Sequence, residues 1–277
     1  MAMDRENGLR APQNAWQRHD WQSTPFSPQL RIVQALVKGG KTASGAGFSR
    51  YDAFSRCLGE TAEIIALAKG EHSEGVAAGP DFAFASQQAL AERLERWAIW
   101  EWWHGNMEAH PISAPALIEQ LRKGAQTPRQ TTLWHLPEFA PLRVSIALSI
   151  SKEGDRPILG FGASICPQAS AQSALIELGL MELNLMAPVE GLSAYFERIL
   201  KAMETHFTIK NPKPVALVED TIASDPQALE ERLTELGIGF QLQNLTTPET
   251  GLSVARAHLP KAPSWKNNED FLNGPLI

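Results

Sequence analysis

Two glutamates and an arginine stand at helical spacing near the middle of the chain. Glu92 and Glu95 are three residues apart, and Arg96 follows directly. On an α-helix such residues share a face. Leu90 on one side and Ile99 on the other predict a helix that is buried on both sides. Buried carboxylates are costly unless a cation pairs with them. The spacing therefore predicts a buried acidic site, balanced either by Arg96 with a second base or by a metal ion.

The same arrangement of small residues and glutamates occurs three times. The set Ala85, Ala89, Leu90, Glu92 and Glu95 recurs thirty-two positions earlier as Ala53, Cys57, Leu58, Glu60 and Glu63. A weaker third copy contains Glu177 and has Leu180 at the second glutamate position. Each copy follows a glycine, for which we expect a turn. The repetition predicts several helices that deliver acids to one place, although the apolar residues opposite Glu60 and Glu63 favour solvated surface when that helix is taken alone.

Composition limits the class of protein. The chain has 277 residues, 43% hydrophobic residues and eight tryptophans, enough for one large domain or two small ones. A net charge of −6 argues against a nucleic-acid-binding protein, which needs a basic face. Two cysteines are too few for a disulfide framework and fit a reducing cytoplasm. Neither a membrane span nor a signal peptide is evident, so we expect a cytoplasmic protein.

The elements that must position these acids alternate between strand and helix. Residues 1–28 lack periodicity and predict an irregular arm, and residues 29–277 form the remaining domain. Strands are predicted at residues 31–37, 142–150, 158–163, 215–218, 238–243 and 252–258, and helices at residues 51–67, 81–103, 169–186, 192–206 and 228–236. Because no regular βαβ period is present, the fold class is mixed α/β.

A glycine-rich run, residues 39–47, separates the first strand from the first helix. A phosphate-binding loop and a plain connection both fit this position. The run lacks the Walker spacing, which favours the connection.

Three stretches of the chain together resemble the YcaO family. They are residues 45–63 (GAGFSRYDAFSRCLGETAE), residues 77–103 with Glu92-x-x-Glu95-Arg96, and Gly160-Phe161-Gly162-Ala163 followed by residues 173–178 (SALIEL). The resemblance implies a mixed-sheet YcaO-like fold whose helices carry carboxylates into a central nucleotide site. It implies that ATP and Mg²⁺ are the cofactors.

The resemblance also assigns roles to individual residues. It implies metal binding by Glu60, Glu63, Glu92, Glu95 and Glu177, and nucleotide binding by Lys41, Ser44 and Arg96. Arg96 as only an ion-pair partner of the glutamates is the competing reading. The sequence departs from the family pattern at Ile64, where Glu-Arg is usual, at Ser173, where arginine is common, and at Leu180, where glutamine is common.

The implied activity is ATP-dependent activation of backbone amides in a ribosomally made peptide. Of the reactions that the resemblance implies, we expect azoline-forming cyclodehydration of Cys, Ser or Thr. Several carboxylates can position a polyphosphate through Mg²⁺, so such amide activation needs no protein nucleophile. The front of the chain shows no domain for grasping a leader peptide, so a leader-binding partner protein is expected, with homo- or hetero-oligomers allowed. Two alternatives stay open. One is thioamide or amidine formation, and the other is a catalytically degenerate subunit of a modifying complex, which Ser173 and Leu180 favour.

Overall fold

The computed structural model describes residues 12–67, 71–137, 139–186, 196–201, 214–217 and 227–263. The chain divides into two compact units that are interleaved in sequence. The first unit comprises residues 1–23, 30–94 and 238–261, and the second comprises residues 24–29, 95–237 and 262–277. The predicted domain over residues 29–277 is therefore built of two units. Within the described part of the chain, no helix combines the length and hydropathy that a membrane span needs.

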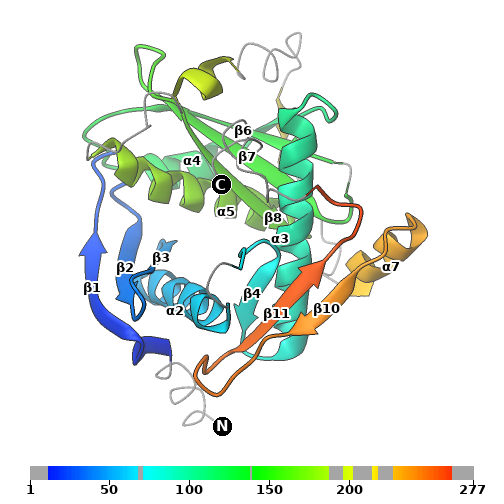
Figure 1. The fold of residues 1–277 in the computed structure, drawn as a ribbon. Coiled ribbons are helices and arrows are strands. Elements are labelled where there is room, and N and C mark those ends of the chain that lie inside the picture. Colours follow the sequence, from blue (N-terminus) through cyan, green and yellow to red (C-terminus); the bar gives the residue numbers. More distant parts are fainter. Residues whose placement is uncertain are drawn as a thin grey trace. The chain divides into compact units, whose positions relative to one another are not determined.

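The first unit contains two antiparallel three-stranded sheets (Figure 1). One has the order β1 (Trp16–Gln22), β2 (Arg31–Val37) and β3 (Thr42–Gly47). The other has the order β10 (Gln241–Asn244), β11 (Ser253–His258) and β4 (Val76–Gly79). Helix α2 (Arg50–Ala66) packs against β2 and β3. β3 and β4 are each an edge strand of their sheet.

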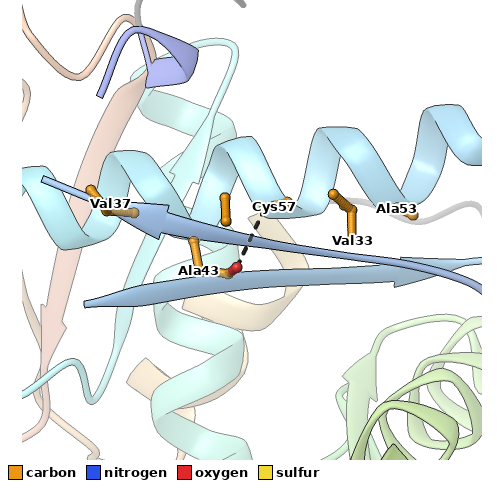
Figure 2. Packing of buried hydrophobic residues seen from close by; sticks show 6 residues of the cluster. Val33, Val37, Ala43, Ala53 and Cys57 are labelled. Carbon is orange, nitrogen blue, oxygen red and sulfur yellow. Dashed lines mark hydrogen bonds between the residues drawn. The ribbon is translucent and has the colours of Figure 1, made fainter. Parts of the chain in front are cut away.

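Helix α2 begins where its sequence supplies a cap and packs with its small residues. The Ser49 side chain accepts a hydrogen bond from the Asp52 backbone N–H, which satisfies one amide of the first turn. Alanine and cysteine side chains on the buried face let the helix approach the sheet closely. Figure 2 shows Ala53 and Cys57 against Val33 and Ala43 of the strands. The Cys57 thiol donates to the Ala43 carbonyl oxygen, and burial together with the charge of Glu60 raises the pKa of this thiol to about 12, so it is not a nucleophile.

The second unit is built on one mixed five-stranded sheet. Its order is β8 (Ile158–Ser164), β7 (Arg143–Ile150), β6 (Gln130–Leu136), β5 (His110–Ser113) and β9 (Val215–Ala216). Only the β5–β9 pair of this sheet is parallel among the described residues. Helix α5 (Pro167–Met181) packs on β8 and β7 and continues into the 3₁₀ helix η1 (Glu182–Leu185). Helices α4 (Pro115–Arg122) and α7 (Gln227–Glu235) complete the labelled elements of this unit.

Helix α3 (Phe82–Trp103) is the longest described helix. Its first part belongs to the first unit and its remainder, from Glu95, to the second. Leu90 and Ile99 are almost completely buried, which confirms that the helix is covered on both sides.

Two sequence predictions about local structure are wrong. The plain connection favoured for residues 39–47 is instead a tight turn at Gly39 and Gly40, which have positive φ angles, followed by strand β3 (Thr42–Gly47), which pairs with β2. The arm over residues 1–28 is not irregular throughout, because Trp16–Gln22 pairs with β2. Both segments owe their structure to pairing with β2, which local composition does not reveal. Residues 1–11, part of the helix predicted at 192–206 and the tail from residue 264 lie outside the described residues.

The glycines before the repeated helices lie in strands and not in turns. A Cβ atom on Gly47 would lie 2.6 Å from the Asp52 Cβ, and one on Gly79 would lie 2.5 Å from the Phe84 ring. A Cβ on Gly160 would lie 2.3 Å from the Leu178 nitrogen. The repeat thus reflects close packing of a helix on the strand that precedes it.

Substituting alanine for Gly160 is expected to destabilise the protein by about 2–4 kcal/mol. The new methyl group would meet backbone atoms, 2.3 Å from the Leu178 nitrogen and 2.4 Å from the Ala174 oxygen, which cannot move aside singly. Urea unfolding measures the loss. Gly239→Ala is the matched control, because nothing lies within 4 Å of its added Cβ. Equal unfolding midpoints for the two variants would contradict the packing argument.

Candidate functional site

Two glutamates of helix α2 reach the edges of two different sheets. Glu60 Oε2 accepts the backbone N–H of Ser44 on β3 at 2.6 Å. Glu63 Oε1 accepts the backbone N–H of Ala78 on β4 at 2.9 Å. Because both strands are edge strands, each carboxylate satisfies an amide that its sheet leaves open. Both side chains are partly buried, so the interpretation of this face as solvated surface is wrong.

The carboxylates of the first unit act on one another electrostatically. Burial raises the pKa of Glu60 to about 7, opposed by the hydrogen bond from Ser44. Burial, followed by the negative charge of Glu92 on α3, raises the pKa of Glu63 well above its usual range, and Glu60 adds to this while the Ala78 N–H opposes it. Glu60 and Glu92 are therefore close enough to Glu63 to disfavour its ionised form. The structure brings Glu60, Glu63 and Glu92 together.

One base beside this cluster escaped the sequence analysis. Arg93 is 5% exposed, and its guanidinium lies 4.0 Å from the Glu74 carboxylate. The negative charges of Glu74 and Glu92 both act on this guanidinium. Burial lowers its pKa and the two acids oppose that shift. The position of Arg93 directly after Glu92 is a weak sequence signal for a partner of that acid, because neighbouring residues on a helix do not share a face. Arg96, four positions after Glu92, shares its face and is therefore the residue that the sequence favours.

Three further predicted site residues, Glu95, Arg96 and Glu177, belong to the second unit. Glu95 is 8% exposed and lies one helical turn after Glu92 on the continuous helix α3, followed by Arg96, which is partly buried. Glu177 lies on α5 and is also partly buried. That Glu95, Arg96 and Glu177 share a site with the acids of the first unit stays a prediction.

The two predicted nucleotide contacts on the first sheet lie in a hairpin. Lys41 is exposed and directly precedes β3, while Ser44 lies within that strand. The Ser44 hydroxyl accepts a hydrogen bond from the Gln34 side-chain amide at 3.5 Å, and its backbone N–H is bound to Glu60. A phosphate cradle of consecutive backbone amides is therefore not formed by this segment. Contacts from the two side chains stay a prediction.

The donor set of the first unit fits a hard divalent cation. Carboxylate oxygens are the ligands that Mg²⁺ prefers, and a cation would relieve the repulsion that raises the pKa of Glu63. Among the residues that the structure describes, no three His, Cys, Asp or Glu side chains already stand at ligand spacing. The acids are thus close together, but Glu60 and Glu63 accept hydrogen bonds from backbone amides. Metal binding would require their carboxylate oxygens to reorient.

The stability of the protein should depend on pH through Glu60. The pKa of this group is about 7 when folded and near 4.5 otherwise, so between these values the folded state holds a proton that the unfolded state has lost. Stability therefore falls as pH rises through this window. Glu60→Gln removes the effect and should be more stable than the parent by about 1–3 kcal/mol at pH 8, with little difference near pH 4.5. Urea unfolding at both pH values tests this, with the exposed Glu119→Gln as control. A difference that is the same at both pH values would contradict it.

A fully buried acid in the second unit was missed by the sequence analysis. Glu182 is 0% exposed and receives two hydrogen bonds of 2.8 Å from the Arg122 guanidinium, one on each oxygen. The hydroxyls of Ser27 and Ser149 each donate to it at 2.7 Å, and the Arg129 Nε lies 3.4 Å away. All hydrogen-bonding capacity of this carboxylate is thereby used within the protein, so its role is structural. No local sequence signal marks it, because its partners are 33 to 155 residues away.

Comparison with known proteins identifies the fold and the family. A family profile described as YcaO cyclodehydratase, ATP- and Mg²⁺-binding, matches residues 68–262. The chain belongs to the YcaO family. The matched range includes Glu92, Glu95 and Glu177 and begins after Glu60 and Glu63, and its description names the cofactors that the sequence resemblance implied. No curated protein sequence matches this YcaO chain.

Three solved structures illustrate the similarity in fold. The YcaO protein of Methanopyrus kandleri bound with AMPPCP and Mg²⁺ has a TM-score of 0.75 and 16% identity, over 97% of this chain and 91% of the other. A heterocyclase in complex with substrate and cofactor has a TM-score of 0.73 and 14% identity, over 93% and 52%. The Escherichia coli microcin synthetase McbBCD complex has a TM-score of 0.60 and 10% identity, over 88% of each chain. These similarities confirm the predicted mixed α/β YcaO fold.

Proposed function

We propose that this YcaO chain uses ATP and Mg²⁺ to activate backbone amides of a ribosomally made peptide, forming azolines from Cys, Ser or Thr. The observation that carries the proposal is the position of three carboxylates at α2 and α3, where burial and the charges of Glu92 and Glu60 raise the pKa of Glu63. The family description, which names ATP and Mg²⁺, supports the same cofactors.

Different residues would bind the metal and the nucleotide. Glu60, Glu63 and Glu92 would hold Mg²⁺ from the first unit, and Glu95 and Glu177 would add carboxylates from the second. For the nucleotide phosphates, Arg96 and Lys41 would supply positive charge and Ser44 a hydroxyl contact. The hydrogen bonds of Glu60 and Glu63 to β3 and β4 would keep these side chains near the metal, while their carboxylate oxygens reorient to bind it.

In this reaction the protein would mainly position the ATP phosphates and neutralise their charge. When bound, MgATP supplies the phosphoryl group that lets the amide oxygen leave as phosphate, after a side chain of the peptide has added to the carbonyl carbon. Carboxylates that hold the metal and cations that hold the phosphates keep this group in place. A protein nucleophile is not required, which fits the high pKa of the Cys57 thiol.

A partner protein would present the peptide. The microcin synthetase that shares the fold is an assembly named McbBCD, and this similarity supports the expectation of a modifying complex. Ser173 and Leu180 favour a second candidate function, in which the chain is a catalytically degenerate subunit of such a complex.

Calorimetric titration with MgATP, with the chain alone and with partner proteins present, separates these two functions. We expect saturable binding that is lost when Mg²⁺ is chelated. If MgATP does not bind under either condition, the enzyme proposal is wrong and the structural subunit remains. Mass spectrometry of the reacted peptide then distinguishes products, since loss of one water per modified residue marks azolines and exchange of oxygen for sulfur marks thioamides.

A further inference from the structure

Strand β1 forms an open edge of the first sheet of the first unit. It pairs with β2 on one side, and in the part of the chain that the structure describes no strand pairs with its other side (Figure 1). Its side chains from residue 17 to residue 22 are exposed on both faces of the strand. Such an edge presents a row of backbone N–H and C=O groups that another strand can bind.

The devices that usually protect an edge are weak here. A β-bulge lies between Trp16 and Arg18, at the first end of the strand, and the pairing from Arg18 to Gln22 is continuous. The exposed stretch contains neither proline nor lysine, the residues that most often block added strands. Trp21 remains 38% exposed although the Arg50 guanidinium covers its ring at 5.2 Å. A regular edge of five residues is therefore accessible.

The charge around this edge is opposite to that of the whole chain. Between residues 12 and 52 the cations are Arg18, Arg31, Lys38, Lys41 and Arg50, all exposed, and the acids are Asp20 and Asp52. The chain as a whole carries −6. The strand register places these cations toward both ends of β1, because Arg18 pairs with Leu36 near the Lys38–Lys41 turn and Gln22 pairs with Ile32 next to Arg31. An extended segment along the strand would meet positive charge near both of its ends.

We propose that the outer edge of β1 binds an acidic, extended segment of a peptide as an added strand. Main-chain hydrogen bonds would supply affinity, and the surrounding cations would select an acidic sequence. That this segment belongs to the substrate peptide rests on the proposed function. It would lie outside the residues that are modified, because the cations here do not discriminate Cys, Ser or Thr.

Hydrogen exchange of the full-length protein tests the proposal without nucleotide. The probe is a synthetic twelve-residue peptide of alternating Glu and Val, compared with one of equal charge in which two valines are replaced by proline. We expect the first peptide to slow amide exchange in residues 17–22 and the second not to. The double variant Arg18→Glu, Arg50→Glu should weaken binding by about tenfold or more, whereas the charge-matched Lys123→Glu, Lys152→Glu should not.

Three results would overturn the edge-binding proposal. They are equal protection by the proline peptide, equal weakening by the control variant, and slow exchange in β1 that depends on protein concentration without peptide, which would assign the edge to a second copy of the chain. MgATP binding is measured separately on the same preparations. A chain that binds MgATP but not the peptide refutes only the edge proposal, and the reverse result refutes only the proposed function.

Discussion

Replacing Glu63 by glutamine is expected to weaken MgATP binding by about 100-fold or more, equivalent to about 3 kcal/mol. Glu63 is the acid on which the charges of Glu60 and Glu92 converge, and a cation between these carboxylates offsets that repulsion. A neutral amide removes one formal negative charge and one strong oxygen ligand from this position. Calorimetric titration with MgATP measures the loss directly.

The same substitution should leave the fold intact or more stable at pH 8. The glutamine carbonyl oxygen can still accept the Ala78 N–H, so the edge of β4 keeps its hydrogen bond. Because the pKa of Glu63 is raised in the folded state, ionising this group costs stability as pH rises above its unfolded value. The glutamine amide does not ionise, so the variant does not lose stability in this way as pH rises. Lost nucleotide binding with retained or increased stability distinguishes a metal ligand from a structural cap.

The control is Glu119→Gln on the exposed surface of α4. It makes the same chemical change away from the acidic cluster and should alter neither MgATP affinity nor stability. Unchanged affinity in the Glu63 variant would exclude this residue from the site. Severe loss of stability would instead assign Glu63 the role of holding β4 in place.

Replacing Glu182 by alanine is expected to destabilise the protein by about 3–5 kcal/mol. The change leaves the Arg122 guanidinium without its two-bond partner and takes from Arg129 the larger of its two acidic partners, Glu182 and Asp155. The side chains of Arg122 and Arg129 are 12% and 3% exposed. It also removes the acceptor for the Ser27 and Ser149 hydroxyls. Breaking one side of a buried charge network costs far more than the network contributes net, because the remaining charges stay desolvated. Urea unfolding reports the difference.

Glu235→Ala supplies the comparison for a surface ion pair. Glu235 is 2.9 Å from Arg232 on α7, with side chains 66% and 42% exposed. Solvent screens such a pair, and its loss should cost less than about 0.5 kcal/mol. Glu182→Gln, which keeps the shape but not the charge, should fall between the two. If the Glu182 and Glu235 alanine variants unfold at the same urea concentration, the buried network does not stabilise the fold as argued.

The sequence by itself determined the features that depend on local periodicity. Helices α2, α3 and α5 repeat small or apolar residues at helical intervals, and this periodicity places Glu60 with Glu63 and Glu92 with Glu95 on shared faces. Three ordered motifs carried the YcaO resemblance, which the family match confirms for the part of the chain it covers. These features can be predicted from the sequence because residues only three or four positions apart share a face of a helix.

Tertiary structure alone decided the features that depend on distant pairing. The edge amides of Ser44 and Ala78 decide how Glu60 and Glu63 are held, and pairing with β2 turns Trp16–Gln22 into a strand. The burial of Glu182 depends on arginines and serines from four separate segments. Whether a carboxylate is solvated, capped or buried in a charge network follows from which remote groups the fold brings to it, because burial and neighbouring charge set its pKa and its cost. Neither the burial of a carboxylate nor the charge of its remote neighbours can be predicted from residue type and spacing.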